Sequence, residues 1–271
     1  MNSHHPVHLC QPDITKSCGA CCGLYNWKDH SRAALQGILK IQTSLVPIYR
    51  QTEDFDTYRK LRDIKIKNNK LFETIYNCEF LGFIDEPQKK VGCLLHPAVT
   101  GGNDLRDYCF YGKEICSAHF CPGYSCLTTT EQKAVVHCLD DWYLYGLVIT
   151  DIDLIKEFFK YAENKIGDSI KEYQLHTPAV ANALREFFSF KENWKFKARE
   201  NRLGKYYFSE AEYNVARIEY KERWGIPASR FDRILVSLES EFQTENDVHA
   251  AENLIVVFFV RFTKILLNHP S

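Results

Sequence analysis

The chain has 271 residues, which is enough for one large domain or two modest ones with a substantial core. Its 34 lysines and arginines against 35 aspartates and glutamates give a formal net charge of −1, which excludes a globally basic nucleic-acid-binding protein. Hydrophobic residues make up 45% and charged residues 25%, an ordinary globular composition that argues against disorder.

Two features of the sequence bear on targeting. The first 13 residues are polar and lack the apolar segment of a secretory signal. The longest apolar stretch, Leu254–Leu267, is interrupted by Arg261 and Lys264 and is shorter than the roughly 20 apolar residues that cross a bilayer. We therefore expect a cytoplasmic protein that binds neither membranes nor nucleic acid, and whose partner is an unknown protein or small molecule.

Residues 31–67 have a helical pattern of apolar residues. Ser31 is a suitable N-cap for the first helix, and Pro47 is expected to bend or break it. A second short helical pattern begins at Asp54.

The residue pattern changes over residues 80–95, where two short apolar runs flank a polar turn that contains Pro87. This pattern predicts a β-hairpin. Residues 97–123 are rich in glycine, aspartate, cysteine and aromatic residues without sustained periodicity, so we expect loops and short helical turns there.

From residue 128 onward the chain predicts helices separated by capping signals. The last helix contains Leu254–Val260, which is apolar nearly all round and is therefore expected at the centre of a bundle. The predicted fold is mainly α, a helical bundle with a small cysteine-rich lobe that contains a β-hairpin and loops. The expected domains are a cysteine-rich metal-binding lobe with two helices over 1–127 and a helical domain over 128–271. The predicted helix starts are Thr130, Thr150 with Asp153, Thr177 with Pro178, Ser209 with Glu212, Ser229 and Thr244.

Cysteine is the anomaly of the composition. Ten of the eleven cysteines lie between Cys10 and Cys126, and only Cys138 lies beyond them. In a reducing compartment, clustered cysteines indicate metal binding or catalysis more often than disulfides. The candidate metal ligands are Cys18, Cys21, Cys22, Cys78, Cys93, Cys109, Cys116, Cys121 and Cys126.

Local features support convergence of these thiols. Gly19 and Gly23 supply the backbone freedom that a tight ligand turn needs. The predicted hairpin returns Cys93 to the neighbourhood of Cys78. Cys10 and Cys138 stand outside the pattern and are interpreted as simply buried thiols.

The grouped cysteines resemble the YkgJ-type family of zinc- or iron-chelating proteins, whose motif is CxxCxxCC. Cys18, Cys21 and Cys22 match the end of the family's cysteine run, and Cys78 with the following Glu-Phe-Leu matches its second element. Gly92-Cys93-Leu-Leu-His-Pro97 matches the third element, and Cys109, three residues after Arg106, corresponds to the later cysteine.

The resemblance covers about residues 15–126 and has departures. Thr15 stands where the family has its first cysteine, and Cys116, Cys121 and Cys126 are additions to the common pattern. The resemblance implies chelation of zinc or iron. Flagellin lysine methylases carry a similar cysteine pattern and are thought to hold an iron–sulfur cluster, which makes a methyltransferase-like enzyme a further alternative.

The spacing bears on which metal is bound. Structural zinc sites usually draw their ligands from two close cysteine pairs, and this chain offers one such pair, Cys18 and Cys21. Iron–sulfur clusters are ligated by four thiolates, often with one remote in sequence. The spacing therefore favours one or two iron–sulfur clusters, with zinc as the alternative cofactor.

Other residues within the cysteine-rich region have structural interpretations. His96 and His119 are expected to form hydrogen bonds or to pack rather than to bind metal. The interleaved aromatic residues are expected to form the small core that the loops need, and the alternative is a shell that excludes water from a metal cluster and tunes its potential. They are Tyr108, Phe110, Tyr111, Phe120 and Tyr124.

Three functional hypotheses follow. The first is a metal-binding protein with cysteine-ligated iron–sulfur clusters for electron transfer, redox sensing or an unidentified reaction. The second is a zinc-stapled, non-enzymatic module that presents its helical half to a partner protein. The third is the methyltransferase-like enzyme. Asp140, Asp141, Asp151 and Asp153 are interpreted as solvated helix starts and caps rather than a catalytic carboxylate pair, and residues 195–202 as a basic, solvated linker between helices.

Overall fold

The computed structural model describes residues 8–199, 203, 205–207 and 213–268. The protein is mainly α, as the sequence predicts. It divides into two compact units. The cysteine-rich unit comprises residues 10–120 and 141–146, and the helical unit comprises the described residues of 1–9, 121–140 and 147–271.

The first helices of the cysteine-rich unit confirm the sequence prediction. The Ser31 hydroxyl accepts a hydrogen bond from the backbone N–H of Ala34, so Ser31 caps the first helix. The chain breaks at Leu45, two residues before Pro47, and the Asp54 carboxylate caps the third helix. The three helices are α1 (Arg32–Ser44), α2 (Val46–Thr52) and α3 (Phe55–Lys65).

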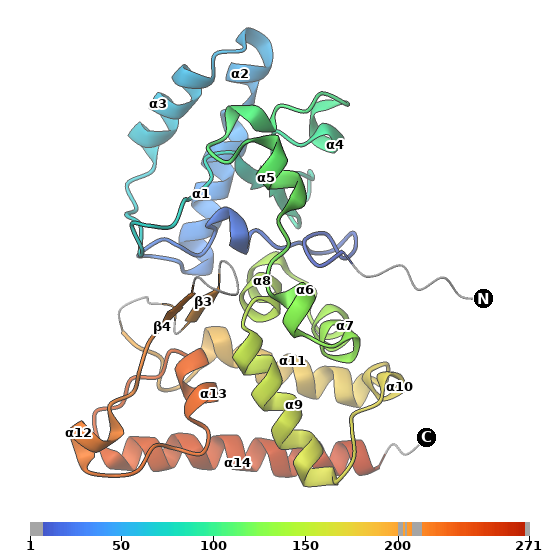
Figure 1. Cartoon of the computed structure of the whole chain (residues 1–271), viewed down its shortest axis with the longest axis vertical. Coiled ribbons are helices and arrows are strands. Elements are labelled where there is room, and N and C mark those ends of the chain that lie inside the picture. Colours follow the sequence, from blue (N-terminus) through green and yellow to red (C-terminus); the bar gives the residue numbers. More distant parts are fainter. Residues whose placement is uncertain (1–7, 200–202, 204, 208–212, 269–271) are drawn as a thin grey trace. The chain divides into compact units, whose positions relative to one another are not determined.

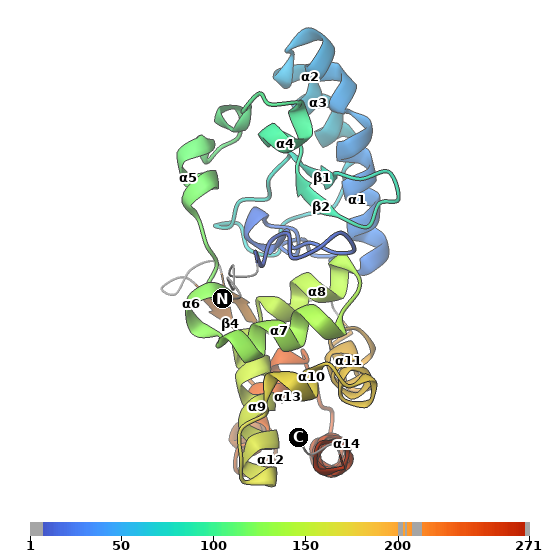
Figure 2. The same cartoon turned by 90° about the vertical axis from the view of Figure 1, so that its right-hand side faces the viewer.

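The predicted hairpin is present as two antiparallel strands, β1 (Leu81–Phe83) and β2 (Val91–Cys93), which lie beside α1 (Figure 2). Gly82 is required because α1 crosses β1 closely. A Cβ at this position would lie 2.6 Å from Thr43 Oγ1 and 2.7 Å from Leu94 Cδ1. Thr43 Oγ1 also accepts a hydrogen bond from the Phe83 N–H at 2.8 Å, which fixes the strand against the helix.

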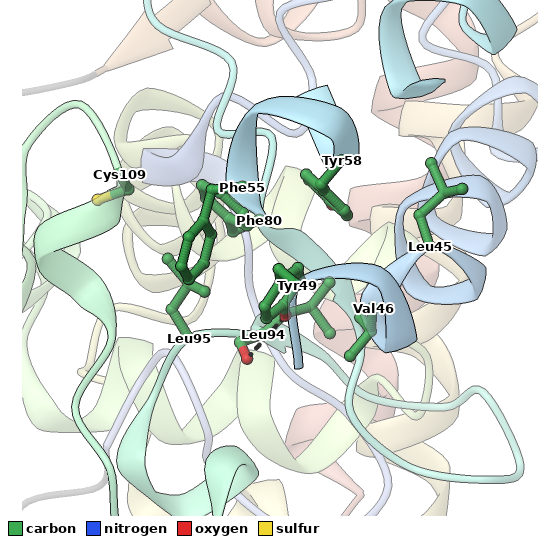
Figure 3. Packing of buried hydrophobic residues seen from close by; sticks show 9 residues of the cluster. All are labelled: Leu45, Val46, Tyr49, Phe55, Tyr58, Phe80, Leu94, Leu95 and Cys109. Carbon is green, nitrogen blue, oxygen red and sulfur yellow. Dashed lines mark hydrogen bonds between the residues drawn. The ribbon is translucent and has the colours of Figure 1, made fainter. Parts of the chain in front are cut away.

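Aromatic rings form the core of the cysteine-rich unit (Figure 3). Tyr58 stacks on Phe80 with ring centroids 5.0 Å apart, and Tyr49 stacks on Phe55 at 5.0 Å. Tyr58 Oη donates a hydrogen bond to the carbonyl of Glu79 at 2.6 Å, so its polar atom is satisfied within the core. The buried members of the cluster are Leu45, Val46, Tyr49, Phe55, Tyr58, Phe80, Leu94, Leu95 and Cys109.

Residues 97–120 consist of short helices and loops, as predicted, and none of the residues in these short helices is buried. The short helices therefore contribute little apolar burial, and the segment packs against the aromatic core through Leu105, Cys109 and Tyr111. Its elements are α4 (Pro97–Thr100), the 3₁₀ helix η2 (Arg106–Tyr108) and α5 (Gly112–Ala118), and the unit also contains the 3₁₀ helix η1 (Ala20–Cys22).

The helical unit is built mainly from α7, α9, α11, α13 and α14, with α9 packed against α13 and α14 (Figure 1). Phe158 on α9 is fully buried and lies within 4.8–6.2 Å, centroid to centroid, of six other phenylalanine rings. The elements after residue 120 are α6 (Gly123–Cys126), α7 (Thr129–Cys138), α8 (Trp142–Ile149), α9 (Ile152–Ile166), α10 (Glu172–Leu175), α11 (Pro178–Asn193), β3 (Lys205–Tyr207), β4 (Tyr213–Val215), α12 (Tyr220–Trp224), α13 (Asp232–Ser237) and α14 (Glu245–Leu267).

Two of the predicted starts, at Thr177 and Thr244, are confirmed as N-caps, and others need correction. The helix expected from Thr130 is capped by Thr128 and ends at Cys138. A new helix follows because Asp141 Oδ1 accepts hydrogen bonds from the N–H groups of Tyr143 and Leu144, both at 2.9 Å. The helix that begins near Ser229 starts at Asp232 instead.

The next predicted cap was placed one residue early. Asp151, and not Thr150, caps α9. Asp151 is also not solvated, because it is 3% exposed and lies 2.9 Å from Lys191 Nζ, which is 2% exposed. The interpretation of Asp151 as a helix cap is confirmed, but its interpretation as solvated is wrong, since this carboxylate takes part in a buried ion pair.

A helix was expected after Ser209 and Glu212, which lie outside the described residues. The flanking residues form a hairpin instead, in which β3 and β4 pair antiparallel with Tyr206 opposite Asn214. The prediction of a helix in this region is therefore wrong for Val215, which lies in β4.

The last helix is buried on one face only. Leu254, Val257 and Val260 are 41%, 67% and 40% exposed, whereas Phe258 and Phe259 are buried. The expectation that Leu254–Val260 is central on all sides is therefore wrong. Within the part of the chain that the structure describes, no helix is both long and apolar enough to cross a membrane.

Candidate thiol cluster

Two distant segments meet where Cys22 lies beside Cys78. Gly23 adopts a left-handed conformation with φ of 78°, and a Cβ there would lie 2.2 Å from the carbonyl oxygen of Tyr76. Only glycine allows this approach. The Cys78 N–H then donates a hydrogen bond to the Cys22 carbonyl at 2.9 Å, which fixes the two cysteines side by side.

The hairpin brings in the third thiol. Cys93 ends β2 and lies opposite Leu81, three residues after Cys78. The N–H of Leu94 donates to the carbonyl of Phe80 at 2.8 Å, so the pairing continues past the strand. The prediction that the hairpin returns Cys93 toward Cys78 agrees with this register.

The fourth and fifth thiols come from the segment that follows the hairpin. The Leu105 N–H donates to the Leu95 carbonyl at 3.1 Å and ties this segment to the end of the hairpin. Cys109 lies at the edge of the aromatic core, with its sulfur directed away from the rings (Figure 3). Its Sγ lies 3.5 Å from Sγ of Cys116 on α5.

These five side chains influence one another electrostatically, and we call them the thiol cluster: Cys22, Cys78, Cys93, Cys109 and Cys116. Burial, together with the charge of Cys93, raises the pKa of Cys22 to about 12. Burial also raises the pKa of Cys78, with additional increases from Cys22 and Cys93. Burial raises the pKa of Cys93, to which the charge of Cys109 adds.

Within the closest pair the two thiols differ in acidity. A hydrogen bond from Cys116 lowers the pKa of Cys109, and the same hydrogen bond raises the pKa of Cys116. Cys109 therefore ionises first. Because the other members hold their protons more tightly, a metal that binds to the cluster must displace protons from it.

Cys10 lies near the thiol cluster, although its place in the sequence indicated a simply buried thiol. It is half-buried, its carbonyl accepts a hydrogen bond from the Cys18 N–H at 2.9 Å, and its charge contributes to the raised pKa of Cys22. Cys10 precedes Cys18 by eight residues, a spacing that does not indicate a metal-binding motif. The position of Cys10 depends on the pairing of the N-terminal segment with β2, in which Gln11 Nε2 donates to the Val91 carbonyl at 2.9 Å.

The remaining candidates have different surroundings. Cys18 accepts a hydrogen bond from the Ala20 N–H and contributes to the raised pKa of Tyr25, and Cys21 is half-buried in η1. Cys121 and Cys126 belong to the helical unit, where Cys121 is buried and Cys126 is half-buried. The assignment of these four as ligands stays a prediction.

Charged side chains lie next to the thiol cluster. Arg106 makes a bidentate ion pair with Asp104, at 2.8 Å and 2.7 Å, and is electrostatically coupled to Cys93 and Cys116. Beside Cys78, the Glu79 carboxylate pairs with Arg59 Nε at 3.0 Å. The positive charge of Arg106 therefore acts on Cys93 and Cys116, and the negative charge of Glu79 acts on Cys78.

The aromatic residues of this region do not form the small core that was expected. Phe110, Phe120 and Tyr108 are 76%, 58% and 45% exposed, although Tyr108 stacks on Phe55. Tyr111 is partly buried against the aromatic core. Three of these aromatic side chains are thus exposed rather than buried in an interior.

The two histidines agree with a structural role. His96 Nδ1 accepts a hydrogen bond from the Ala98 N–H at 3.2 Å and caps α4. Burial lowers the pKa of His119, which favours its neutral form.

The donor set fits a soft or borderline metal, because thiolates are its ligands of choice. Two thiolates on one tetrahedral zinc ion lie roughly 3.8 Å apart, close to the 3.5 Å between Cys109 and Cys116. Among the residues that the structure describes, however, no three His, Cys, Asp or Glu side chains are already placed to hold a metal ion. Metal binding would therefore have to draw the five thiols closer together.

The architecture defines a mainly helical protein with a separate unit that gathers thiols from distant segments. Comparison of the chain with protein-family models, curated proteins and solved structures found no significant match. The resemblance to the YkgJ-type family thus stays a prediction from the cysteine motifs.

Proposed function

We propose that this protein binds a thiolate-ligated metal centre, an iron–sulfur cluster in preference to zinc, in its cysteine-rich unit. The observation that carries the proposal is the approach of five thiols from separate parts of the chain, with the Sγ atoms of Cys109 and Cys116 3.5 Å apart. Several neighbouring thiols that raise one another's pKa match the ligand set of a metal.

The distribution of these thiols supports iron–sulfur ligation. None of the five thiols shares a Cys-x-x-Cys pair with another, although structural zinc sites commonly use two such pairs. Four cysteines hold an iron–sulfur cluster, which supplies one-electron transfer when bound. In this assignment the ligands come from two groups of thiols. Cys22, Cys78 and Cys93 form one group, and Cys109 with Cys116 on α5 forms the other.

The same assignment explains how residues 97–120 are held in place. Their short helices bury no residue, so apolar packing alone contributes little to their order. A centre bound by Cys93, Cys109 and Cys116 would join this segment to the hairpin, because metal-binding free energy becomes folding free energy.

Metal analysis of anaerobically purified protein tests the proposal. We expect iron with acid-labile sulfide and a brown colour. Zinc in a colourless protein would identify the alternative cofactor. The absence of both metals would overturn the proposal.

Cysteine substitutions test the ligand assignment. Cys22→Ser and Cys93→Ser should each lower bound metal at least about twofold and lower thermal stability as well. Cys138→Ser is the matched control, since Cys138 is buried in α7 of the helical unit, where its thiol donates to the Val135 carbonyl. Metal contents of both variants equal to that of the control would remove Cys22 and Cys93 from the ligand set.

A further inference from the structure

The closest pair of the thiol cluster has a geometry suited to a second chemistry. Cys109 Sγ and Cys116 Sγ lie 3.5 Å apart as thiols. A disulfide requires about 2.05 Å, so the two sulfurs must approach by roughly 1.5 Å. Gly112, with φ of 69°, turns the chain between them, and its N–H donates to the Cys109 carbonyl at 3.2 Å.

The structure allows this approach, because α5 is a surface helix. None of its residues is buried, and Ile115, next to Cys116, is 53% exposed. A small shift of α5 therefore disrupts no core contact. By contrast, Cys109 is 7% exposed and is held by the aromatic cluster.

The two thiols also differ in their access to solvent. Cys116 is exposed, whereas Cys109 is buried directly beside it. An oxidant in solution therefore reaches Cys116 first, and the sheltered thiol is the nearest partner for the oxidised sulfur. This arrangement of one accessible and one resolving thiol is typical of reversible thiol oxidation.

We propose that Cys109 and Cys116 form a reversible disulfide in response to hydroperoxides. The Cys116 sulfur passes its proton along the hydrogen bond to the Cys109 thiolate and attacks the peroxide O–O bond, which gives a sulfenic acid and a hydroxide that takes a proton from solvent and leaves as water when the oxidant is hydrogen peroxide. The Cys109 sulfur then attacks the Cys116 sulfur, the S–O bond breaks, and a second water leaves with the two remaining protons. The thiols together lose two electrons, which reduce one peroxide to two waters.

The regulatory consequence rests on the proposed metal centre. A disulfide between Cys109 and Cys116 withdraws two of the five thiols and leaves Cys22, Cys78 and Cys93, which are fewer than the four ligands of a structural site. Oxidation would therefore release the metal, and a thiol reductant would restore the site.

Peptide mapping of the full-length, metal-free protein tests the disulfide independently of metal content. Trypsin cuts after Arg106 and Lys113 and so places the two sulfurs on separate peptides. After treatment with hydrogen peroxide, we expect the 107–113 and 114–133 peptides to be linked, with the loss of two thiols, and reduction with dithiothreitol to separate them. The 114–133 peptide also contains Cys121 and Cys126, so Cys116→Ser must abolish the link.

A second variant tests the order of the two steps. In Cys109→Ser the resolving thiol is missing, so dimedone should label Cys116 as a trapped sulfenic acid, while the Cys138→Ser control behaves like the natural chain. Unlinked peptides, or a link that survives in Cys116→Ser, would overturn the proposal. A link in protein that never binds metal would preserve the disulfide and refute only the metal centre.

Discussion

The two units of this protein contrast in how their parts are held together. In the helical unit, phenylalanines from α9, α11 and α14 meet around Phe158, and long helices supply them. In the cysteine-rich unit, aromatic rings bind α1–α3 to the hairpin, but residues 97–120 bury little and carry thiols instead. Apolar burial therefore suffices for one unit, whereas the proposed metal centre would supply an attachment that part of the other obtains less from apolar burial.

Metal removal should therefore affect the two units unequally, and this is the largest effect we expect. Anaerobic chelation should speed amide hydrogen exchange over residues 97–120 by at least about tenfold, because the segment loses its main attachment. Helices α9 and α14 should keep their protection. Equal loss of protection in both units would contradict the comparison, and no change in either would contradict the metal centre.

A core truncation tests the other side of the contrast. Phe158→Ala should lower the free energy of unfolding of the helical unit by about 3–5 kcal/mol, because it leaves a cavity among packed rings. Phe110→Ala is the matched control in the cysteine-rich unit, since its ring is 76% exposed, and it should change stability by no more than about 0.5 kcal/mol. Chemical denaturation measures both values, and similar losses in the two variants would show that the contrast is wrong.

The helical unit also contains a buried ion pair, which makes it less purely apolar than its phenylalanines indicate. Lys191 Nζ contacts Asp151 Oδ2 at 2.9 Å and the Ser237 carbonyl at 2.8 Å. Lys191→Ala should cost about 3–5 kcal/mol, because the Asp151 charge is left buried without its partner. Lys191→Ala with Asp151→Asn should recover part of this loss in the same denaturation assay, since asparagine keeps a cap for α9 without the charge. A double variant as unstable as Lys191→Ala would show that the charge is not the cause.

Local signals in the sequence account for much of this fold. Ser31, Asp54 and Thr244 cap helices because their side chains bond to nearby N–H groups, an interaction that depends only on neighbouring residues. The hairpin follows from its two apolar runs and turn. The sequence did not predict that one helix ends at Cys138 and another begins at Trp142. Several threonines and aspartates in the region are suitable caps, and the pattern does not show that Asp141 is the one that begins a new helix.

The site was less predictable than the fold. The sequence identified Cys22, Cys78, Cys93, Cys109 and Cys116 as candidates, yet their spacing could not separate them from Cys121 and Cys126, which lie in the other unit. Neither the position of Cys10 near Cys22 nor the burial of Asp151 has a local signal. Both depend on contacts between residues far apart in the chain, which a pattern of neighbours does not contain.

The weakest expected effect concerns an ion pair within residues 97–120, between Asp104 and Arg106. A hydrogen bond from Arg106 lowers the pKa of Asp104 from 3.8 to about 2. Because the pKa is lower in the folded state, the stabilisation is complete above pH 3.8 and is lost as the pH falls toward about 2. Asp104→Asn should therefore flatten the dependence of stability on pH over this window.

An NMR titration of the Asp104 carboxyl carbon measures the shift directly, and Arg106→Gln should return the pKa toward its ordinary value. Since Asp104 is solvent-accessible, salt should weaken the shift as well. A carboxyl group that titrates near 3.8 in the natural chain would show that this ion pair does not order the segment. The attachment of residues 97–120 would then depend on the thiols, the Leu105–Leu95 hydrogen bond and the stacking of Tyr108 on Phe55.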